Sequence, residues 1–311
     1  MSTAFFTHIE CRGHDMGRGH PESPQRLTAI EDHLLATGLE ATLTRRDAPL
    51  VALEHVAFAH SSGYVNQLRD LLEEVSRSGN PRALDPDTSA SAGTWAAVQR
   101  GAGAAVAATQ GVLAGEFNNA FCAVRPPGHH ATRGRAMGFC FFNNVAIAAR
   151  YALDVGGLTR VAIVDFDVHH GNGTEDIVAN DDRMLMVSYF QHPLYPGSGV
   201  PPLGSNMVNL PVPPYTKGPE IRALIEQHWL PRLEAFRPEM IFISAGFDAH
   251  REDGLGQLGL VEADYEWMTK RIKELADKHA KGRIVSCLEG GYNLSALARS
   301  VAAHLRVLSA A

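Results

Sequence analysis

The sequence predicts an α/β fold with a mainly parallel central sheet covered by helices on both faces. Short apolar runs alternate with segments of helical periodicity along the chain. The apolar runs are continuous rather than alternating, which is typical of parallel strands buried on both faces. No linker, charge block or internal repeat divides the 311 residues. We therefore expect a single domain over residues 1–311, long enough to bury one large core.

Five apolar runs are predicted to be buried strands. They are residues 120–124, 161–164, 184–187, 240–244 and 284–287.

The first predicted helix follows Ser23 and Pro24, which suit the N-cap and the first helical position, and Gly38 should stop it. Residues 102–115 are small and mostly apolar, so we expect a helix packed closely on the sheet.

Three further helical patterns occupy the C-terminal third. Apolar residues recur at helical spacing over residues 265–275 and 294–308, with Asn293 as the cap of the second pattern. Pro231 interrupts the pattern of residues 221–236, so a kink or break is expected there.

Charge and cysteine usage limit the classes of partner. The formal net charge is −6 and no basic run occurs, so we expect no nucleic-acid partner. No apolar stretch is long enough for a membrane helix, and the first ten residues do not resemble a secretory signal. The four cysteines form no CxxC pair. This favours a reducing compartment, and we expect a cytoplasmic protein.

Titratable side chains follow four of the predicted strands. Residues 125–130 follow the first strand, 165–171 the second, Asp248 the fourth and 289–293 the fifth. In open α/β sheets, sites form outside the carboxyl ends of the strands. We expect these four segments to meet in one crevice.

Asp165, Asp167 and His169 alternate along an extended segment, so their side chains should project to the same side. Asp167 and His169 could then bind one cation, with Asp248 adding a second carboxylate, while Asp165 reaches a neighbouring group. One imidazole and two carboxylates leave a position for water or substrate, as in catalytic metal sites. This donor set suits zinc, iron(II), cobalt or manganese.

The adjacent His129 and His130 follow a Pro-Pro-Gly turn. Imidazoles can serve as general base and general acid near pH 7, and each needs a partner that fixes its tautomer. Asp165 and Asn172 are the candidate partners. Tyr292 follows two glycines, Gly290 and Gly291, that would let the backbone approach a ligand, and its phenol could stabilise an oxyanion.

Together these motifs resemble the histone deacetylase superfamily, whose members have the arginase-like α/β fold. The matching segments are residues 20–26, 125–130, 138–144, 165–173, 244–248 and 289–293. Asn172 and the Ser-Ala-Gly-Phe-Asp248 motif resemble class II members and bacterial histone deacetylase-like amidohydrolases.

The resemblance implies a metal-dependent amidohydrolase that removes acetyl or other acyl groups from lysine side chains. Asp167, His169 and Asp248 would bind a catalytic zinc ion. A structural potassium ion would be shared by Asp165, Asp167, His169 and Ser188.

The catalytic roles also follow from the resemblance. His130 matches the general base, His129 matches its neighbour held by Asp165, and Asn172 would orient His130. Tyr292 matches the tyrosine that polarises the acyl carbonyl.

The resemblance also implies the groups that bind substrate. Gly138, Phe139 and Tyr195 match the tunnel that holds a straight alkyl chain, with Gly291 beside it. Asp87 matches a rim aspartate. Leu255 lies near the position where polyamine deacetylases place an acidic residue, so an apolar residue there argues against a cationic acetylpolyamine.

Three other functions remain open from the residues. An arginase-like ureohydrolase with two manganese ions would need an Asp-Ala-His-x-Asp motif, and residues 248–251 lack its final aspartate. A non-catalytic acyl-lysine binder would not need Tyr292. A deacylase of acetylpolyamines or another small acylated amine would use the same groups. The sequence also leaves open the acyl-chain preference, the metal used in the cell and a homo-oligomer.

Overall fold

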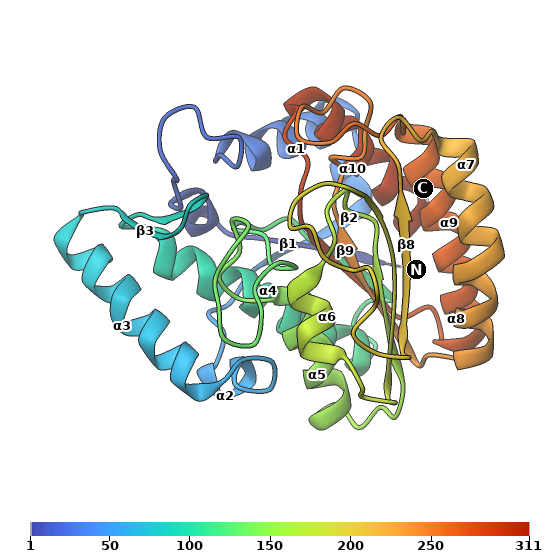
Figure 1. Cartoon of the computed structure of the whole chain (residues 1–311), viewed down its shortest axis with the longest axis horizontal. Helices are drawn as coiled ribbons and strands as arrows, with labels where there is room; N and C mark the ends of the chain where they lie inside the picture. The colour runs from blue at the N-terminus through green and yellow to red at the C-terminus, as the bar shows by residue number, and fades with distance from the viewer. Residues whose placement is uncertain (1, 311) are drawn as a thin grey trace.

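The computed structural model describes residues 2–310. These residues fold around one central eight-stranded sheet, which they also form (Figure 1). Its order is β2-β1-β5-β10-β9-β6-β7-β8, and every pairing in this sheet is parallel. The strands are β1 (Thr3–Thr7), β2 (Leu43–Asp47), β5 (Asn119–Cys122), β6 (Val161–Asp165), β7 (Met184–Gln191), β8 (Met207–Val212), β9 (Met240–Ala245) and β10 (Ile284–Leu288). A separate antiparallel hairpin joins β3 (Arg82–Asp85) to β4 (Thr88–Ala90).

Helices cover both faces of the sheet, as predicted. Figure 1 shows α8, α9 and α10 on one side and α4, α5 and α6 on the other. The helices are α1 (Gln25–Ala36), α2 (Leu53–Val56), α3 (Ser62–Ser78), α4 (Thr94–Ala114), α5 (Asn144–Asp154), α6 (Asn172–Val178), α7 (Gly218–Leu224), α8 (Leu230–Phe236), α9 (Glu262–His279) and α10 (Leu294–Ser309). Among residues 2–310, no helix combines the length and the apolar character needed to cross a bilayer.

All five predicted strands are present, as β5, β6, β7, β9 and β10. These five are buried at every position, which is why their sequences are continuously apolar. The prediction missed the other three strands of the large sheet. The two edge strands, β2 and β8, carry partly exposed or polar side chains, and β8 contains Pro211, which an edge strand tolerates.

The helix ends are mostly as predicted. Asn293 caps α10 through its side chain, and Gly38 lies in the left-handed region directly after the C-cap of α1. The Ser23 cap is wrong, because α1 begins one residue later with Pro24 in the cap position and no side-chain cap. The helix expected over 102–115 begins earlier, at Thr94.

The irregularity expected at Pro231 is a π-helical turn, Ile225–Trp229, between α7 and α8. Proline has no N–H to donate, so a wider turn just before it relieves the helical hydrogen-bond pattern.

Candidate active site

The four predicted site segments meet at one place because their strands are neighbours. β5, β10, β9 and β6 lie side by side in the middle of the sheet and run in the same direction. Their carboxyl ends therefore open on one edge, where each strand delivers its polar side chains.

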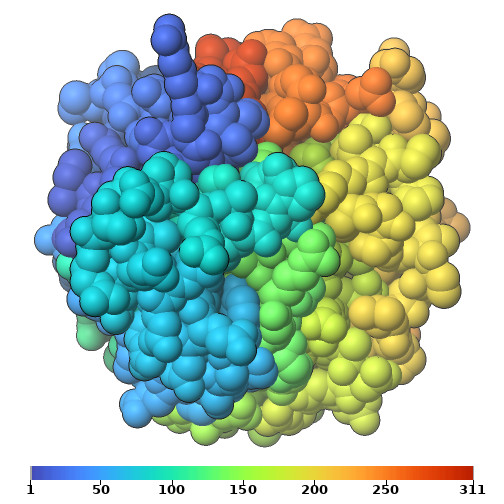
Figure 2. All heavy atoms as spheres, turned by 60° about the vertical axis from the view of Figure 1, so that its left-hand side comes forward, coloured from blue at the N-terminus to red at the C-terminus, as the bar shows by residue number. Residues whose placement is uncertain are grey.

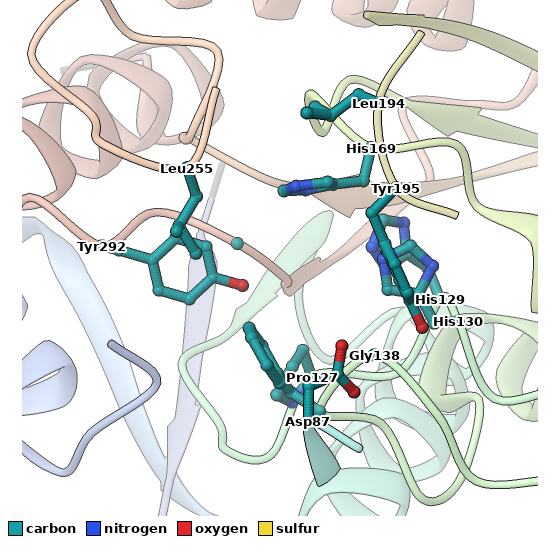
Figure 3. Close-up of a pocket in the computed structure, with 12 residues that line it drawn as sticks. Asp87, Pro127, His129, His130, Gly138, His169, Leu194, Tyr195, Leu255 and Tyr292 are labelled. Atoms are coloured by element: carbon teal, nitrogen blue, oxygen red, sulfur yellow. The ribbon is translucent and has the colours of Figure 1, made fainter. Parts of the chain in front are cut away.

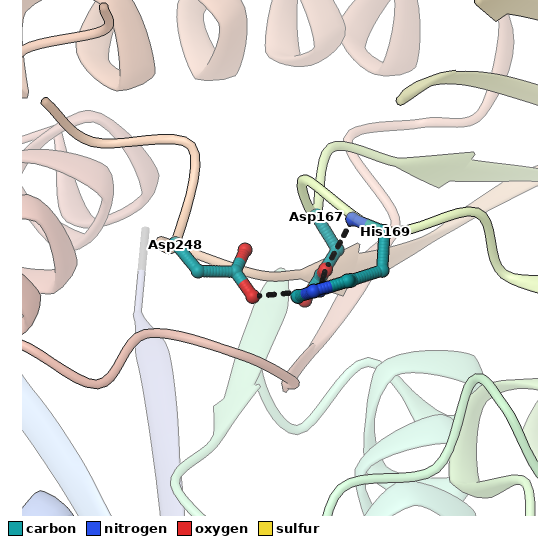
Figure 4. A group of neighbouring side chains, drawn as sticks. All are labelled: Asp167, His169 and Asp248. Carbon is teal, nitrogen blue, oxygen red and sulfur yellow. Dashed lines mark hydrogen bonds and ion pairs between the residues drawn. The ribbon is translucent and has the colours of Figure 1, made fainter. Parts of the chain in front are cut away.

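Asp167, His169 and Asp248 form a compact cluster at this edge (Figure 4). One ligand atom from each residue lies within 4.8 Å of the others. Nδ1 of His169 lies 3.0 Å from Oδ1 of Asp167 and 3.1 Å from Oδ2 of Asp248. Both carboxylates are buried, whereas the His169 side chain keeps 11% of its surface exposed. The cluster can therefore hold a cation that remains open to one side.

Backbone amides orient the two carboxylates. The N–H of Gly290 donates to Oδ2 of Asp167 at 2.9 Å, and the N–H of Val168 donates to Oδ1 of Asp248 at 3.0 Å. Burial and the charge of Asp167 raise the pKa of Asp248 to about 6. Two carboxylates so close together in a buried position favour a cation that compensates both charges.

The tandem histidines have the partners that the sequence predicted. Nδ1 of His129 lies 3.0 Å from Oδ2 of Asp165, and Nδ1 of His130 lies 2.7 Å from Oδ1 of Asn172. Burial opposes the charged form of His129, but Asp167 and Asp165 raise its pKa. Burial and the two neighbouring histidines lower the pKa of His130. His129 therefore favours the protonated form and His130 the neutral form, which suits different roles in proton transfer.

A cavity of about 220 Å³ opens above the cluster (Figure 3). It is lined by Asp87, Pro127, His129, His130, Gly138, Phe139, His169, Leu194, Tyr195, Leu255, Gly290 and Tyr292. Figure 2 shows chain segments of four colours (teal, green, yellow and orange) meeting on the face seen there, although they lie far apart in the sequence.

The lining includes most of the predicted substrate-binding residues. Gly291 is the exception. Among residues 2–310, its neighbour Gly290 lines the cavity instead. The sequence did not single out Pro127 or Leu194.

Tyr292 points its hydroxyl into the cavity (Figure 3). Burial raises its pKa well above the usual value, so the phenol keeps its proton. The carboxylate of Asp253 accepts hydrogen bonds from the backbone N–H groups of Tyr292 and Asn293, at 2.6 and 2.9 Å, and from that of Leu255 at 3.0 Å. One side chain that the sequence reading missed therefore joins two walls of the cavity.

Comparison with known proteins decides the family. A model of the histone deacetylase domain matches residues 20–308. This chain belongs to the histone deacetylase family.

Individual relatives agree with this assignment. A probable deacetylase of Archaeoglobus fulgidus is 38% identical, over 94% of this chain and 82% of that protein. A histone deacetylase-like amidohydrolase of Pseudomonas aeruginosa is 36% identical, over 88% of this chain and 73% of that protein. The crystal structure of the HDA15 HD domain matches with a TM-score of 0.92 and 33% identity, covering 99% of this chain and 90% of that one. The predicted deacetylase-like fold is thus confirmed.

In this histone deacetylase family member, a buried ionic network supports the turn before Tyr292. Arg26 donates to the backbone carbonyls of Glu289 and Gly291, and its guanidinium lies 4.9 Å from the centre of the Tyr292 ring. Glu22, fully buried, pairs with both Arg26 and Arg125. The matching segment 20–26 pointed to this region, but only the fold shows which carbonyls Arg26 reaches.

Glu289 holds the backbone of the segment that carries the two adjacent histidines. Its Oε2 accepts hydrogen bonds from the N–H groups of Gly128 and His129, at 2.6 and 3.0 Å. Burial raises its pKa to about 7. The carboxyl group therefore fixes the backbone that presents both histidines of the family's tandem pair.

Ser188 lies beside Asp165 in the pairing of β6 with β7. Its hydroxyl is buried and has no hydrogen-bond partner within residues 2–310. A buried hydroxyl oxygen without a partner next to a carboxylate fits a bound cation that would use it as a ligand.

Proposed function

We propose that this chain is a zinc-dependent amidohydrolase that removes acetyl or other acyl groups from lysine side chains, with residues 1–311 forming one catalytic domain. The observation that carries the proposal is the Asp167, His169 and Asp248 cluster at the floor of a cavity that also presents His130 and Tyr292. We also propose a cytoplasmic location, because the four cysteines form no CxxC pair, which favours a reducing compartment.

The donor set fits zinc, because two carboxylates and one imidazole leave a position for water or substrate. Bound there, zinc would act as a Lewis acid and lower the pKa of a water molecule. Potassium is the second proposed ion, held by Asp165, Asp167, His169 and Ser188. The unpartnered Ser188 hydroxyl supports this second site.

The tandem histidines would transfer the protons. Because Nδ1 of His130 is engaged by Asn172, its Nε2 is the nitrogen left for chemistry. We propose that this atom accepts a proton from the attacking water and later returns one to the leaving amine. Nδ1 of His129 lies 3.0 Å from Oδ2 of Asp165, and the protonated imidazole would balance the negative charges of Asp165 and Asp167 beside His130.

Tyr292 would stabilise the developing oxyanion. Its phenol remains protonated and points into the cavity, so it can donate a hydrogen bond to the acyl oxygen. Asp253 and Arg26 hold the Tyr292 backbone and ring, so the donor is positioned before substrate arrives.

The cavity walls favour an acylated alkylamine. Phe139 and Tyr195 present aromatic rings that can flank a straight methylene chain, and Asp87 places a carboxylate beside them. Leu255 is apolar at a position where an acidic residue would attract the free ammonium group of an acetylpolyamine. This favours acyl-lysine in a peptide or protein over a cationic acetylpolyamine, which remains the alternative.

The test is turnover of fluorogenic acetyl-lysine and trifluoroacetyl-lysine peptides. Chelation should abolish cleavage, and zinc should restore it. Tyr292→Phe should lower the rate by about two or more orders of magnitude with unchanged zinc content, because loss of one oxyanion donor commonly has that effect.

Other results would redirect the proposal. Cleavage of acetylputrescine but not of lysine peptides by the zinc-loaded protein would assign a small-amine deacylase. Peptide binding without turnover of either substrate would indicate a non-catalytic acyl-lysine binder.

A further inference from the structure

The second histidine of the His169-His170 pair does not take part in the metal cluster. His170 is buried, with Nδ1 lying 2.8 Å from the hydroxyl of Ser198 and Nε2 lying 3.0 Å from Oε2 of Glu175. Its ring packs against Phe190, with 4.6 Å between ring centres. His169 and His170 therefore face different neighbours, and the contacts of His170 lead toward the connection between β7 and β8.

Glu175 and Asn209 extend these contacts. Oε1 of Glu175 accepts hydrogen bonds from the N–H of Leu203 at 3.0 Å and from the side-chain amide of Asn209 at 2.9 Å. The same Asn209 amide donates to the carbonyl of Gly199 at 3.0 Å. We name His170, Glu175, Asn209 and Ser198 the His170 cluster. It brings together the loop after β6, helix α6, strand β8 and the β7–β8 connection.

The β7–β8 connection, residues 192–206, has no helix or strand of its own. Between residues 193 and 203, which the structure describes throughout, the hydrogen bonds to other elements all run through the His170 cluster. This stretch carries Leu194 and Tyr195, two residues of the cavity wall. Tyr195 is 36% exposed, so packing alone restrains it weakly.

Gly199 shows how closely this stretch approaches His170. A Cβ atom at Gly199 would lie 2.6 Å from Cζ of Phe190 and 2.8 Å from Cδ2 of His170. Its φ of +92° is also a conformation that other residues rarely adopt. The backbone therefore contacts the two rings directly, with no room for a side chain.

We propose that His170, through Glu175, Asn209 and Ser198, is a positioning residue that holds the β7–β8 connection and thereby sets Tyr195 and Leu194 in the wall of the substrate cavity. The role in substrate binding rests on the proposed function. The anchoring of residues 193–203 does not.

Two variants test the anchor by different routes. His170→Phe keeps an aromatic ring but removes the partner of Oε2 of Glu175 and of the Ser198 hydroxyl. Gly199→Ala disturbs the close approach to the rings of Phe190 and His170 without removing a polar group. Both should speed hydrogen exchange at the amides within residues 193–203 by about tenfold or more, with the hydrogen-bonded amides of Gly197 and Leu203 as the main reporters. In His170→Phe the cause is the loss of buried polar contacts, each worth about one factor of ten. In Gly199→Ala it is the Cβ contact below 3.0 Å together with the positive φ. Should His170→Phe fail to fold, Gly199→Ala decides alone.

The catalytic readout separates positioning from general damage. KM for an acetyl-lysine peptide should rise about tenfold, while kcat changes by less than about threefold. A long straight-chain hydroxamate that fills the cavity should bind more weakly in both variants. Acetohydroxamate, which is too short to reach the wall, should bind as in the wild type. His170→Gln, which keeps an amide donor for Glu175, should recover part of the loss.

His304→Phe is the matched control. His304 is also buried and also has two polar partners, the hydroxyls of Thr269 at 2.7 Å and Ser286 at 3.0 Å, but it lies on α10 away from the connection. This variant should lower the melting temperature without changing exchange in residues 193–203.

Exchange of residues 193–203 within about twofold of wild type in a folded variant would overturn the proposal, as would a fall in kcat at constant KM. If the zinc-loaded wild type cleaves no amide, the proposed function fails and the exchange result alone decides the anchoring.

Discussion

Gly290→Ala should damage the metal cluster, because this glycine lies against both of its carboxylates. An added Cβ would lie 2.1 Å from Oδ2 of Asp248 and 2.6 Å from Oδ2 of Asp167. Real Cβ contacts essentially never fall below 3.0 Å, so at least one carboxylate must move by about 1 Å. The φ of Gly290 is not positive, so the effect is steric and not one of backbone strain.

Metal sites require ligand distances within about 0.2 Å of their ideal values. Mutation of residues that only contact the ligands commonly lowers metal affinity 10- to 100-fold. Direct displacement of a ligand should therefore lower zinc affinity by about 100-fold or more. The assay is a competitive zinc titration against a chromophoric chelator. Deacylase activity at fixed zinc is a second readout.

Gly134→Ala is the control, because a Cβ there meets nothing within 4 Å and its φ is ordinary. It should bind zinc as the wild type does. If Gly290→Ala keeps zinc affinity within about tenfold of the wild type, the assignment of the two carboxylates as ligands is refuted.

Two further predictions concern charge. Asn172→Asp would place a negative charge about where Oδ1 of Asn172 now lies 2.7 Å from Nδ1 of His130. This charge should raise the pKa of the imidazole and so move the acidic limb of the pH–rate profile to higher pH. An unmoved limb would exclude Asn172 as the group that tunes His130. Burial opposes the ionisation of Glu22, but Arg125 and Arg26 lower its pKa from 4.5 to about 2. Its folded-state pKa lies below the unfolded value, so its stabilisation is complete above about pH 4.5 and is lost as the pH falls toward 2. Urea denaturation of Glu22→Gln should therefore show a smaller fall in unfolding free energy over that range than the wild type, and parallel curves would contradict the argument.

The interior of the sheet was predictable because burial on both faces leaves a continuous apolar signal. The edge strands gave no such signal. In β2, three residues are exposed, including Arg45 and Arg46, and this composition is indistinguishable from a loop in the sequence. β1 is buried throughout, but its short run between two threonines was not recognised as a strand.

The site was predictable where function depends on residue type at a strand end. Asp167, His169 and Asp248 come together as expected, and so do the two histidines with Asp165 and Asn172. Residues that act through backbone contacts were harder to find. Arg26 reaches the carbonyl of Gly291 across 265 positions, and nothing in its local sequence specifies that contact. Asp253 likewise acts on N–H groups about 40 positions away.

The neighbouring positions of β6 and β9 have a consequence for the order of events during folding. His169 and Asp248 are 79 positions apart, and they meet only when these two strands pair. Pairing of parallel strands distant in the sequence is slow, because the entropy of loop closure is lost before the contacts form. A metal ion bound by these side chains would therefore not act as an early template for folding. The ion would enter a pocket that protein contacts have already shaped, and its binding energy would then oppose unfolding of the finished sheet.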